Sequence, residues 1–277
     1  MPELPELDVV CEVLQRRLIG QSITGVHVFP PGGPIVVRDL IQAGFDHSLL
    51  NASFASVTRR GKILIFAFQP PADFFLTLNP KLTGRLQLAA PGDRRHAKTH
   101  VIFTLANGQE LRYLDQKTMG QIYLTRDLAR VPDYAGLGPE PFEISLAEFR
   151  ARLKPYRGEI KGVLTRGEFI AGVGNAYADE ILWAARLHPY RKRTQLTADE
   201  IDRLYDALRV TLRDATEKVR AGMGEEIQRE PRDFMAVHMK TGEPCPRCGT
   251  PISLVSANQR ITNFCRTCQP GGLIKGM

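Results

Sequence analysis

Residues 245–268 read CPRCGTPISLVSANQRITNFCRTC, and this stretch holds two CxxC pairs separated by residues 249–264. The first pair is Cys245 and Cys248, and the second is Cys265 and Cys268. This spacing is typical of one tetrahedral Zn²⁺ held by four thiolates. Disulfides are the alternative, but thiols stay reduced in a protein that lacks a secretory signal. We therefore predict one structural zinc, since four protein ligands leave no open position for catalysis.

The segment between the pairs, SANQRITNF (256–264), predicts a short hairpin. Its tip would present Arg260, either as a solvated surface arginine or as a ligand for a phosphate. The local sequence favours neither reading. Residues 236–277 lack long apolar runs, so the metal has to replace a hydrophobic core in this part of the chain.

Composition limits the possible classes of protein. The 277 residues, 43% of them hydrophobic, suit two ordinary domains, and the net charge of +7 favours a polyanionic partner. No apolar run approaches the roughly 20 residues that span a bilayer. The first residues include Glu3, Glu6 and Asp8, where a signal peptide would be apolar. We therefore expect a cytoplasmic protein with no membrane partner.

The apolar spacing of residues 4–19 predicts an amphipathic helix that Gly20 ends. Alternating segments then predict strands, which cover residues 22–29, 62–68, 74–78, 84–88, 99–105 and 110–114. Short strands without intervening helices indicate an antiparallel sandwich. The proline- and glycine-rich stretch 131–142 marks a boundary, and helical periodicity follows it. We expect an α+β protein with domains at 1–132, 133–235 and 236–277.

Three short segments contain candidate functional residues. In MPELPELD (1–8), Pro5 and Glu6 suit the first turn of a helix, but that role does not explain Pro2. In GVGNAYADEIL (172–182), Asn175 stands at a helix start, either as a plain N-cap, which the local sequence favours, or as a phosphate ligand. In RRGK (59–62), a turn at Gly61 would place Lys62 at the edge of a hairpin.

Taken together, PELPELD, RRGK, GVGNAYADEIL, LHP (187–189) and CPRCG…QRITNFCRTCQ resemble the formamidopyrimidine-DNA glycosylase and endonuclease VIII family, and PELPE is closer to the formamidopyrimidine branch. The resemblance covers nearly the whole chain. It implies an N-terminal helix on a β-sandwich, a helix-two-turn-helix domain and a C-terminal zinc-ribbon hairpin. It also implies that a damaged base is flipped out of duplex DNA and removed, after which the strand is cut by β,δ-elimination.

The resemblance also implies roles for individual residues. With Met1 removed, Pro2 would expose a secondary amine that forms a Schiff base with the sugar, Glu3 would act as acid and base, and Glu6 would support them. The positions that match DNA-contacting residues of the family are Lys62, Lys161, Asn175 and Arg260 for phosphates and Leu82, Lys117 and Met119 for the gap left by the flipped base.

Three segments depart from the family pattern. NPKLTG (79–84) and DQKTMG (115–120) place Leu82, Lys117 and Met119 where methionine, arginine and phenylalanine are usual, so discrimination of the opposite base is expected to differ. LTRG (164–167) has Arg166 in place of an acidic residue. Residues 221–245 are short and acidic compared with the glycine-rich loop that closes over an oxidised purine, which favours ring-opened bases or abasic sites over 8-oxoguanine.

Three hypotheses stay open at this level. The chain is either an active, monomeric glycosylase and abasic-site lyase that acts at the nucleoid of a bacterial cell, or a weak or inactive relative that only binds damaged DNA. An unrelated zinc-ribbon protein of transcription or translation would leave the N-terminal motif unused. The intact motif residues favour the enzyme.

Overall fold

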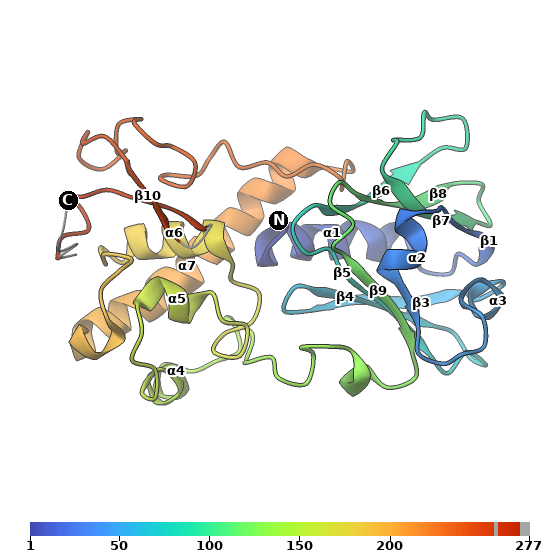
Figure 1. The fold of residues 1–277 in the computed structure, drawn as a ribbon, viewed down its shortest axis with the longest axis horizontal. Helices are drawn as coiled ribbons and strands as arrows, with labels where there is room; N and C mark the ends of the chain where they lie inside the picture. The colour runs from blue at the N-terminus through green and yellow to red at the C-terminus, as the bar shows by residue number, and fades with distance from the viewer. Residues whose placement is uncertain (258–259, 272–277) are drawn as a thin grey trace. The chain divides into compact units, whose positions relative to one another are not determined.

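The computed structural model describes residues 1–257 and 260–271. The chain divides into two compact units (Figure 1). The first unit comprises Met1–Gly136 with Val219–Pro231, and the second comprises Leu137–Lys218 with the residues from Arg232 on. Within the described ranges, no helix combines the length and the apolar character that crossing a bilayer requires.

The first unit begins with helix α1 (Leu4–Leu18). Its N-cap is Glu3, and Gly20 follows it with a φ of +79°, a left-handed conformation that glycine adopts without strain. Leucine and valine side chains at helical spacing form its buried face, including Leu7, Val10 and Leu14. The predicted amphipathic helix is therefore confirmed to within one residue.

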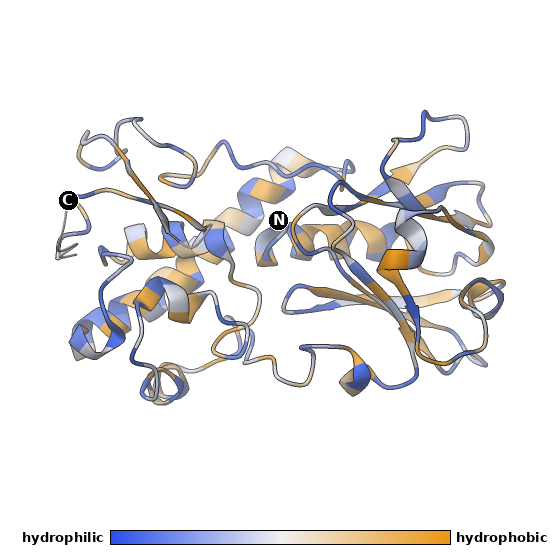
Figure 2. Ribbon diagram, viewed as in Figure 1, coloured by the Kyte–Doolittle hydropathy of each residue, from blue (hydrophilic) through white to orange (hydrophobic). Residues whose placement is uncertain are grey.

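Two sheets follow α1, one of four strands in the order β1-β7-β8-β6 and one of five in the order β2-β9-β5-β4-β3. Figure 2 shows hydrophobic colouring along the strands that form this core. The strands are β1 (Ile23–Val28), β2 (Val37–Asp39), β3 (Phe54–Arg60), β4 (Ile63–Phe68), β5 (Phe75–Asn79), β6 (Gly84–Ala89), β7 (Thr99–Leu105), β8 (Glu110–Asp115) and β9 (Gln121–Thr125).

The expected antiparallel sandwich is confirmed, with two corrections. The short strand β2 pairs with β9 in parallel, and two five-residue helices, α2 (Gly32–Val36) and α3 (Phe45–Leu49), interrupt the run of strands. The sequence also did not predict β2, β3 or β9. Strand β3 lies at a sheet edge and alternates only partly between buried and exposed positions, which weakens its pattern.

The second unit is helical and ends in a hairpin. Phe149 contacts the rings of Phe169 and Tyr205 at centroid distances of 5.2 and 5.5 Å, which forms the centre of its core. Strands β10 (Ser253–Ala257) and β11 (Arg260–Phe264) form the predicted hairpin. The helices are α4 (Leu146–Leu153), α5 (Ile160–Leu164), α6 (Asn175–Ala184) and α7 (Ala198–Met223), of which α7 continues into the first unit from Val219 on. The short 3₁₀ turns are η1 (Leu128–Arg130) in the first unit and η2 (Arg193–Gln195) in the second.

Candidate functional site

The start of α1 holds two buried carboxylates beside Pro2. Glu3 and Glu6 are each 1% exposed. The backbone N–H of Glu3 donates to Oε2 of Glu6 over 2.9 Å, and the Glu3 side chain accepts from the N–H of Glu6 in return. This reciprocal capping box fixes both side chains against the helix start. Pro2 and Glu6 line a pocket of about 20 Å³ together with Arg85.

Glu230 is a residue of this pocket that the sequence did not suggest. Its carboxylate lies 3.2 Å from the Met1 amine and also pairs with Arg85. In the sequence, residues 221–245 are notable only because they depart from the glycine-rich loop of the family. The structure places Glu230 in the first unit with α1, because residues 219–231 pack there.

Lys62 lies in a tight turn that is tied to α1. Gly61 has a φ of +57° and turns the chain between β3 and β4, as expected. Nε of Arg59 donates to Oδ1 of Asp8 in α1 over 2.6 Å, and its Nη1 donates to the carbonyl oxygen of Gly61 over 2.9 Å. The side chain of Arg59 is only 10% exposed. It fastens the turn that contains Lys62 to α1, the helix that begins directly after Glu3.

Two loops of the first unit present the residues expected to enter DNA. Leu82 is 41% exposed and Met119 is 47% exposed, while Lys117 is also exposed. Asp115 holds the two loops together, since it accepts hydrogen bonds from the Thr83 hydroxyl and from the backbone N–H groups of Lys117 (3.1 Å) and Gly120 (2.7 Å). The structure therefore brings Leu82, Lys117 and Met119 into one arrangement.

Asp115 stays ionised in this arrangement. Burial acts to raise its pKa, but the hydrogen bonds from Thr83, Gly120 and Lys117 outweigh burial and hold the pKa below its ordinary value. The Tyr113 hydroxyl, 3.1 Å away, is a further donor. Thr83 follows Leu82 directly and Asp115 precedes Lys117 by two residues, so their nearness to the predicted residues is the sequence signal for them.

The second unit contains Asn175 at the first position of α6. Its N-cap is Gly174, and no side chain makes the cap hydrogen bond. The interpretation of Asn175 as a plain N-cap is therefore wrong. Its Nδ2 instead donates to the carbonyl oxygen of Ile261 in β11 over 2.9 Å. Arg260 begins β11 beside Ile261, and its side chain lies outside the part of the chain that the structure describes.

Lys161 is buried in the second unit, with only 7% of its surface exposed. Its ammonium lies 2.7 Å from Oδ1 of Asp179 and donates to the Thr262 hydroxyl and the Ile261 carbonyl oxygen over 2.8 and 3.0 Å. Lys161 and Asn175 thus bind the same carbonyl of β11. This geometry connects α5, α6 and the hairpin that carries Arg260.

A turn at residues 237–240 is docked on the same elements. The carboxylate of Glu180 in α6 accepts the backbone N–H groups of Ala236, Val237 and His238 over 2.8 to 2.9 Å. Burial raises the pKa of Glu180 in spite of these donors. Nδ1 of His238 also lies 2.8 Å from Oδ2 of Asp179. The turn is therefore held rigidly against α6.

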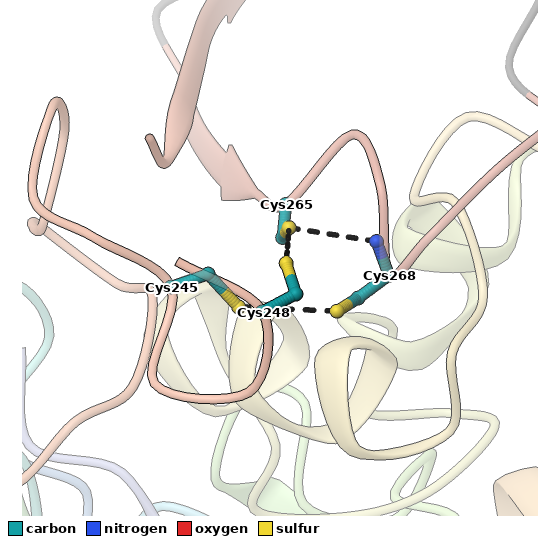
Figure 3. A group of neighbouring side chains, drawn as sticks. All are labelled: Cys245, Cys248, Cys265 and Cys268. Atoms are coloured by element: carbon teal, nitrogen blue, oxygen red, sulfur yellow. Dashed lines mark hydrogen bonds between the residues drawn. The ribbon is translucent and has the colours of Figure 1, made fainter. Parts of the chain in front are cut away.

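The four cysteines converge in one cluster (Figure 3). Their Sγ atoms all lie within 4.8 Å of one another, with Cys245–Cys268 at 3.9 Å and Cys248–Cys265 at 3.4 Å. Sulfurs that share a tetrahedral Zn²⁺ at about 2.3 Å lie roughly 3.8 Å apart. The cluster fits one structural zinc, as predicted.

Comparisons with known proteins give the same assignment along the chain. Residues 1–122 match the formamidopyrimidine-DNA glycosylase N-terminal domain, and residues 137–226 match the H2TH domain of the same glycosylase. Residues 242–271 match the zinc finger found in FPG and IleRS. The three matches follow one another in the order that the sequence motifs indicate.

Similar proteins cover almost the whole chain. Formamidopyrimidine-DNA glycosylases of Symbiobacterium thermophilum and Pelotomaculum thermopropionicum are each 37% identical, over 98% and 97% of this chain and 90% and 99% of their own length. A structure of MutM with DNA containing carbocyclic 8-oxo-G superposes with a TM-score of 0.84 at 30% identity, over 98% of this chain and all of that one. A structure of the Lactococcus lactis enzyme with FAPY-dG-containing DNA superposes with a TM-score of 0.84 at 30% identity, over 97% of this chain and all of that one. The chain belongs to the formamidopyrimidine-DNA glycosylase family, whose members are DNA glycosylases of base excision repair with abasic-site lyase activity.

Proposed function

We propose that this protein removes oxidised or ring-opened bases from duplex DNA through a Schiff base at Pro2 and cuts the strand by β,δ-elimination. The observation that carries the proposal is the pair of buried carboxylates, Glu3 and Glu6, locked beside Pro2 at the start of α1. In a chain without Met1, the Pro2 nitrogen is a secondary α-amine. Such an amine titrates near 8, against about 10.4 for lysine, so far more of it is nucleophilic at neutral pH.

The chemistry follows from this amine. Its nitrogen attacks C1′ of the sugar, the bond from C1′ to the base breaks, and the base leaves with a proton. The attacking nitrogen loses its proton, and the C1′–O4′ bond of the sugar then breaks as O4′ is protonated, which leaves an iminium between the nitrogen and C1′. This iminium is an electron sink that makes the 2′ hydrogen of the sugar acidic, which permits elimination of the 3′ phosphate and then of the 5′ phosphate. Glu3 is placed to protonate the sugar ring oxygen and to move protons during elimination. Glu6 holds Glu3 in position through its backbone N–H.

The remaining residues bind the duplex. Lys62, Asn175 and Arg260 contact phosphates, and Leu82, Lys117 and Met119 fill the space that the flipped nucleotide leaves. Lys161 is a positioning residue for β11, because its ammonium is buried against Asp179. The zinc held by the four cysteines organises the hairpin that carries Arg260. The proposed domains are 1–132, 133–235 and 236–277, and the protein acts as a monomer at the nucleoid in the cytoplasm.

Borohydride trapping tests this function. Reduction of the iminium on a duplex with an abasic site should leave a covalent adduct between protein and DNA. Pro2→Gly, and a form that retains Met1, should lose most of the adduct, since the retained form has a tertiary amide at Pro2. Glu3→Gln should bind abasic DNA but fail to release bases. No adduct with any substrate would favour the alternative, a family member that only binds damaged DNA.

A further inference from the structure

Met239 has a backbone conformation that its side chain disfavours. It lies in the turn at residues 237–240, which the N–H of Lys240 closes by donating to the Val237 carbonyl oxygen over 3.1 Å. Its φ is +61°, in the third position of the turn, where glycine or asparagine is the usual residue. An unbranched apolar side chain gains nothing locally from this conformation. The strain has to be offset by the surroundings or retained for a function.

The side chain of Met239 also does not pack in a core. It is 66% exposed, the largest value among the exposed large hydrophobic residues in the described part of the chain. The other non-glycine residues with positive φ in residues 1–257 and 260–271 are polar or charged, namely Gln42, Asn51, Lys81, Thr118, Asp133 and Arg186. Met239 therefore combines backbone strain with exposure of an apolar side chain, and neither feature stabilises the fold.

The surroundings keep Met239 rigidly in place. Its backbone N–H donates to Oδ1 of Asn263 in β11 over 3.0 Å, and Asn263 is fully buried. The N–H of His238 donates to Glu180 in α6. These two anchors belong to the elements that carry Asn175 and Arg260. Asn263 follows Ile261 by two residues, which is about 7 Å along a strand, and the Ile261 carbonyl holds Asn175.

We infer that Met239 is a specificity-determining residue that contacts the base of the damaged nucleotide, an inference that rests on the proposed function. A flexible, polarisable thioether adapts to the face of a planar base and gains free energy when the contact removes it from water. The turn is anchored to α6 and β11, which carry Asn175 and Arg260, the residues proposed to bind the phosphates beside the same nucleotide. The hydrogen bonds to Glu180 and Asn263 maintain the strained backbone at Met239. A glycine at this position would relieve the strain but would have no side chain to contact the base.

Binding measurements with matched duplexes test the inference. All variants carry Glu3→Gln so that the base is not released, and fluorescence anisotropy compares a duplex containing a formamidopyrimidine with the same duplex containing a tetrahydrofuran abasic site. Met239→Gly should weaken binding of the lesion duplex about tenfold and that of the abasic duplex less than about twofold. Met239→Leu, which keeps an apolar side chain, should retain most of the preference for the lesion.

Stability separates this role from a structural one. Met239→Gly and Met239→Asn should unfold at the same temperature as the parent or higher, because both residues tolerate the left-handed conformation. Gln42→Gly, which relieves a φ of +58° in the first unit, is the matched control and should leave both affinities unchanged. Equal losses on the two duplexes, no loss on either, or a lower unfolding temperature for Met239→Gly would each overturn the inference. Failure of the wild-type protein to form a borohydride adduct would refute the proposed chemistry, while the ratio of the two affinities would still decide the role of Met239.

Discussion

The ammonium of Lys161 lies 2.7 Å from the carboxylate of Asp179, and both side chains are buried in the second unit. Asp179 also accepts from the Asn263 N–H over 3.2 Å, so the ion pair joins α5 and α6 to β11. The resemblance suggested that Lys161 contacts DNA. The structure places its charge within the protein, where it holds the strand that begins at Arg260.

Lys161→Met should therefore destabilise the second unit. The substitution leaves the buried Asp179 carboxylate without its cation, which costs about 3–5 kcal/mol in comparable buried pairs. Chemical denaturation followed by circular dichroism measures the free energy of unfolding. Lys154→Met, at an exposed position, is the control and should change it by less than about 0.5 kcal/mol. Equal effects of the two substitutions would show that the buried pair has no special role.

Asp115→Asn should change how stability depends on pH. The pKa of Asp115 is below its ordinary value of 3.8 in the folded protein, so its carboxylate contributes stability that is complete above about pH 4 and is lost as pH falls through the folded pKa. The amide of asparagine cannot accept from Lys117 and Gly120 together as the carboxylate does. The variant should lose about 2 kcal/mol at neutral pH and show a shallower decline in acid.

Asp73→Asn is the control for that measurement, because Asp73 is 66% exposed in a surface pair with Arg126. Its profile of stability against pH should follow that of the wild type. A decline in acid that is equally steep for Asp115→Asn would show that other carboxylates cause it.

Substitutions of the proposed phosphate ligands should separate by their charge. Lys62→Ala and Arg260→Ala should each weaken binding of all duplexes and reduce the slope of log affinity against log salt by about 0.9, since each removes one cation from a phosphate. Asn175→Ala should weaken binding without changing the slope, because the amide is neutral. Lys154→Ala is a control for loss of an exposed positive charge. Unchanged affinity of all three variants for an abasic duplex would contradict these assignments.

Removal of zinc should abolish DNA binding and be visible in the fluorescence of the only tryptophan. Nε1 of Trp183 donates to the sulfur of Cys245 over 3.4 Å, and the guanidinium of Arg247 lies 4.1 Å from the ring centroid. Chelation should expose this indole and shift its emission to the red, while far-ultraviolet circular dichroism keeps the signal of the first unit. Metal analysis should find one zinc per chain. DNA binding that survives complete removal of zinc would contradict a structural role for the metal.

The sequence by itself determined the features that depend on local spacing. Residues 4–18 form a helix because apolar side chains recur on one face and Glu3 and Glu6 cap each other, and the spacing of the four cysteines is enough to indicate zinc. The motifs PELPELD and RRGK were also enough to select Pro2, Glu3 and Lys62 as candidate functional residues. Strand β3 escaped prediction because its edge position weakens the alternation of buried and exposed residues, and β9 because it is buried at all positions but the first.

Only the tertiary structure decided which groups share their hydrogen bonds. Lys161, Asp179 and Thr262 are far apart in sequence. Lys161 is buried in an internal ion pair, and not exposed as a surface ligand, because α5, α6 and β11 pack around it. Asn175 likewise does not cap α6, and its side chain donates to the Ile261 carbonyl oxygen of β11. A one-dimensional pattern records residue types and spacing, whereas desolvation and hydrogen-bond partners are set by elements that meet only when the chain has folded.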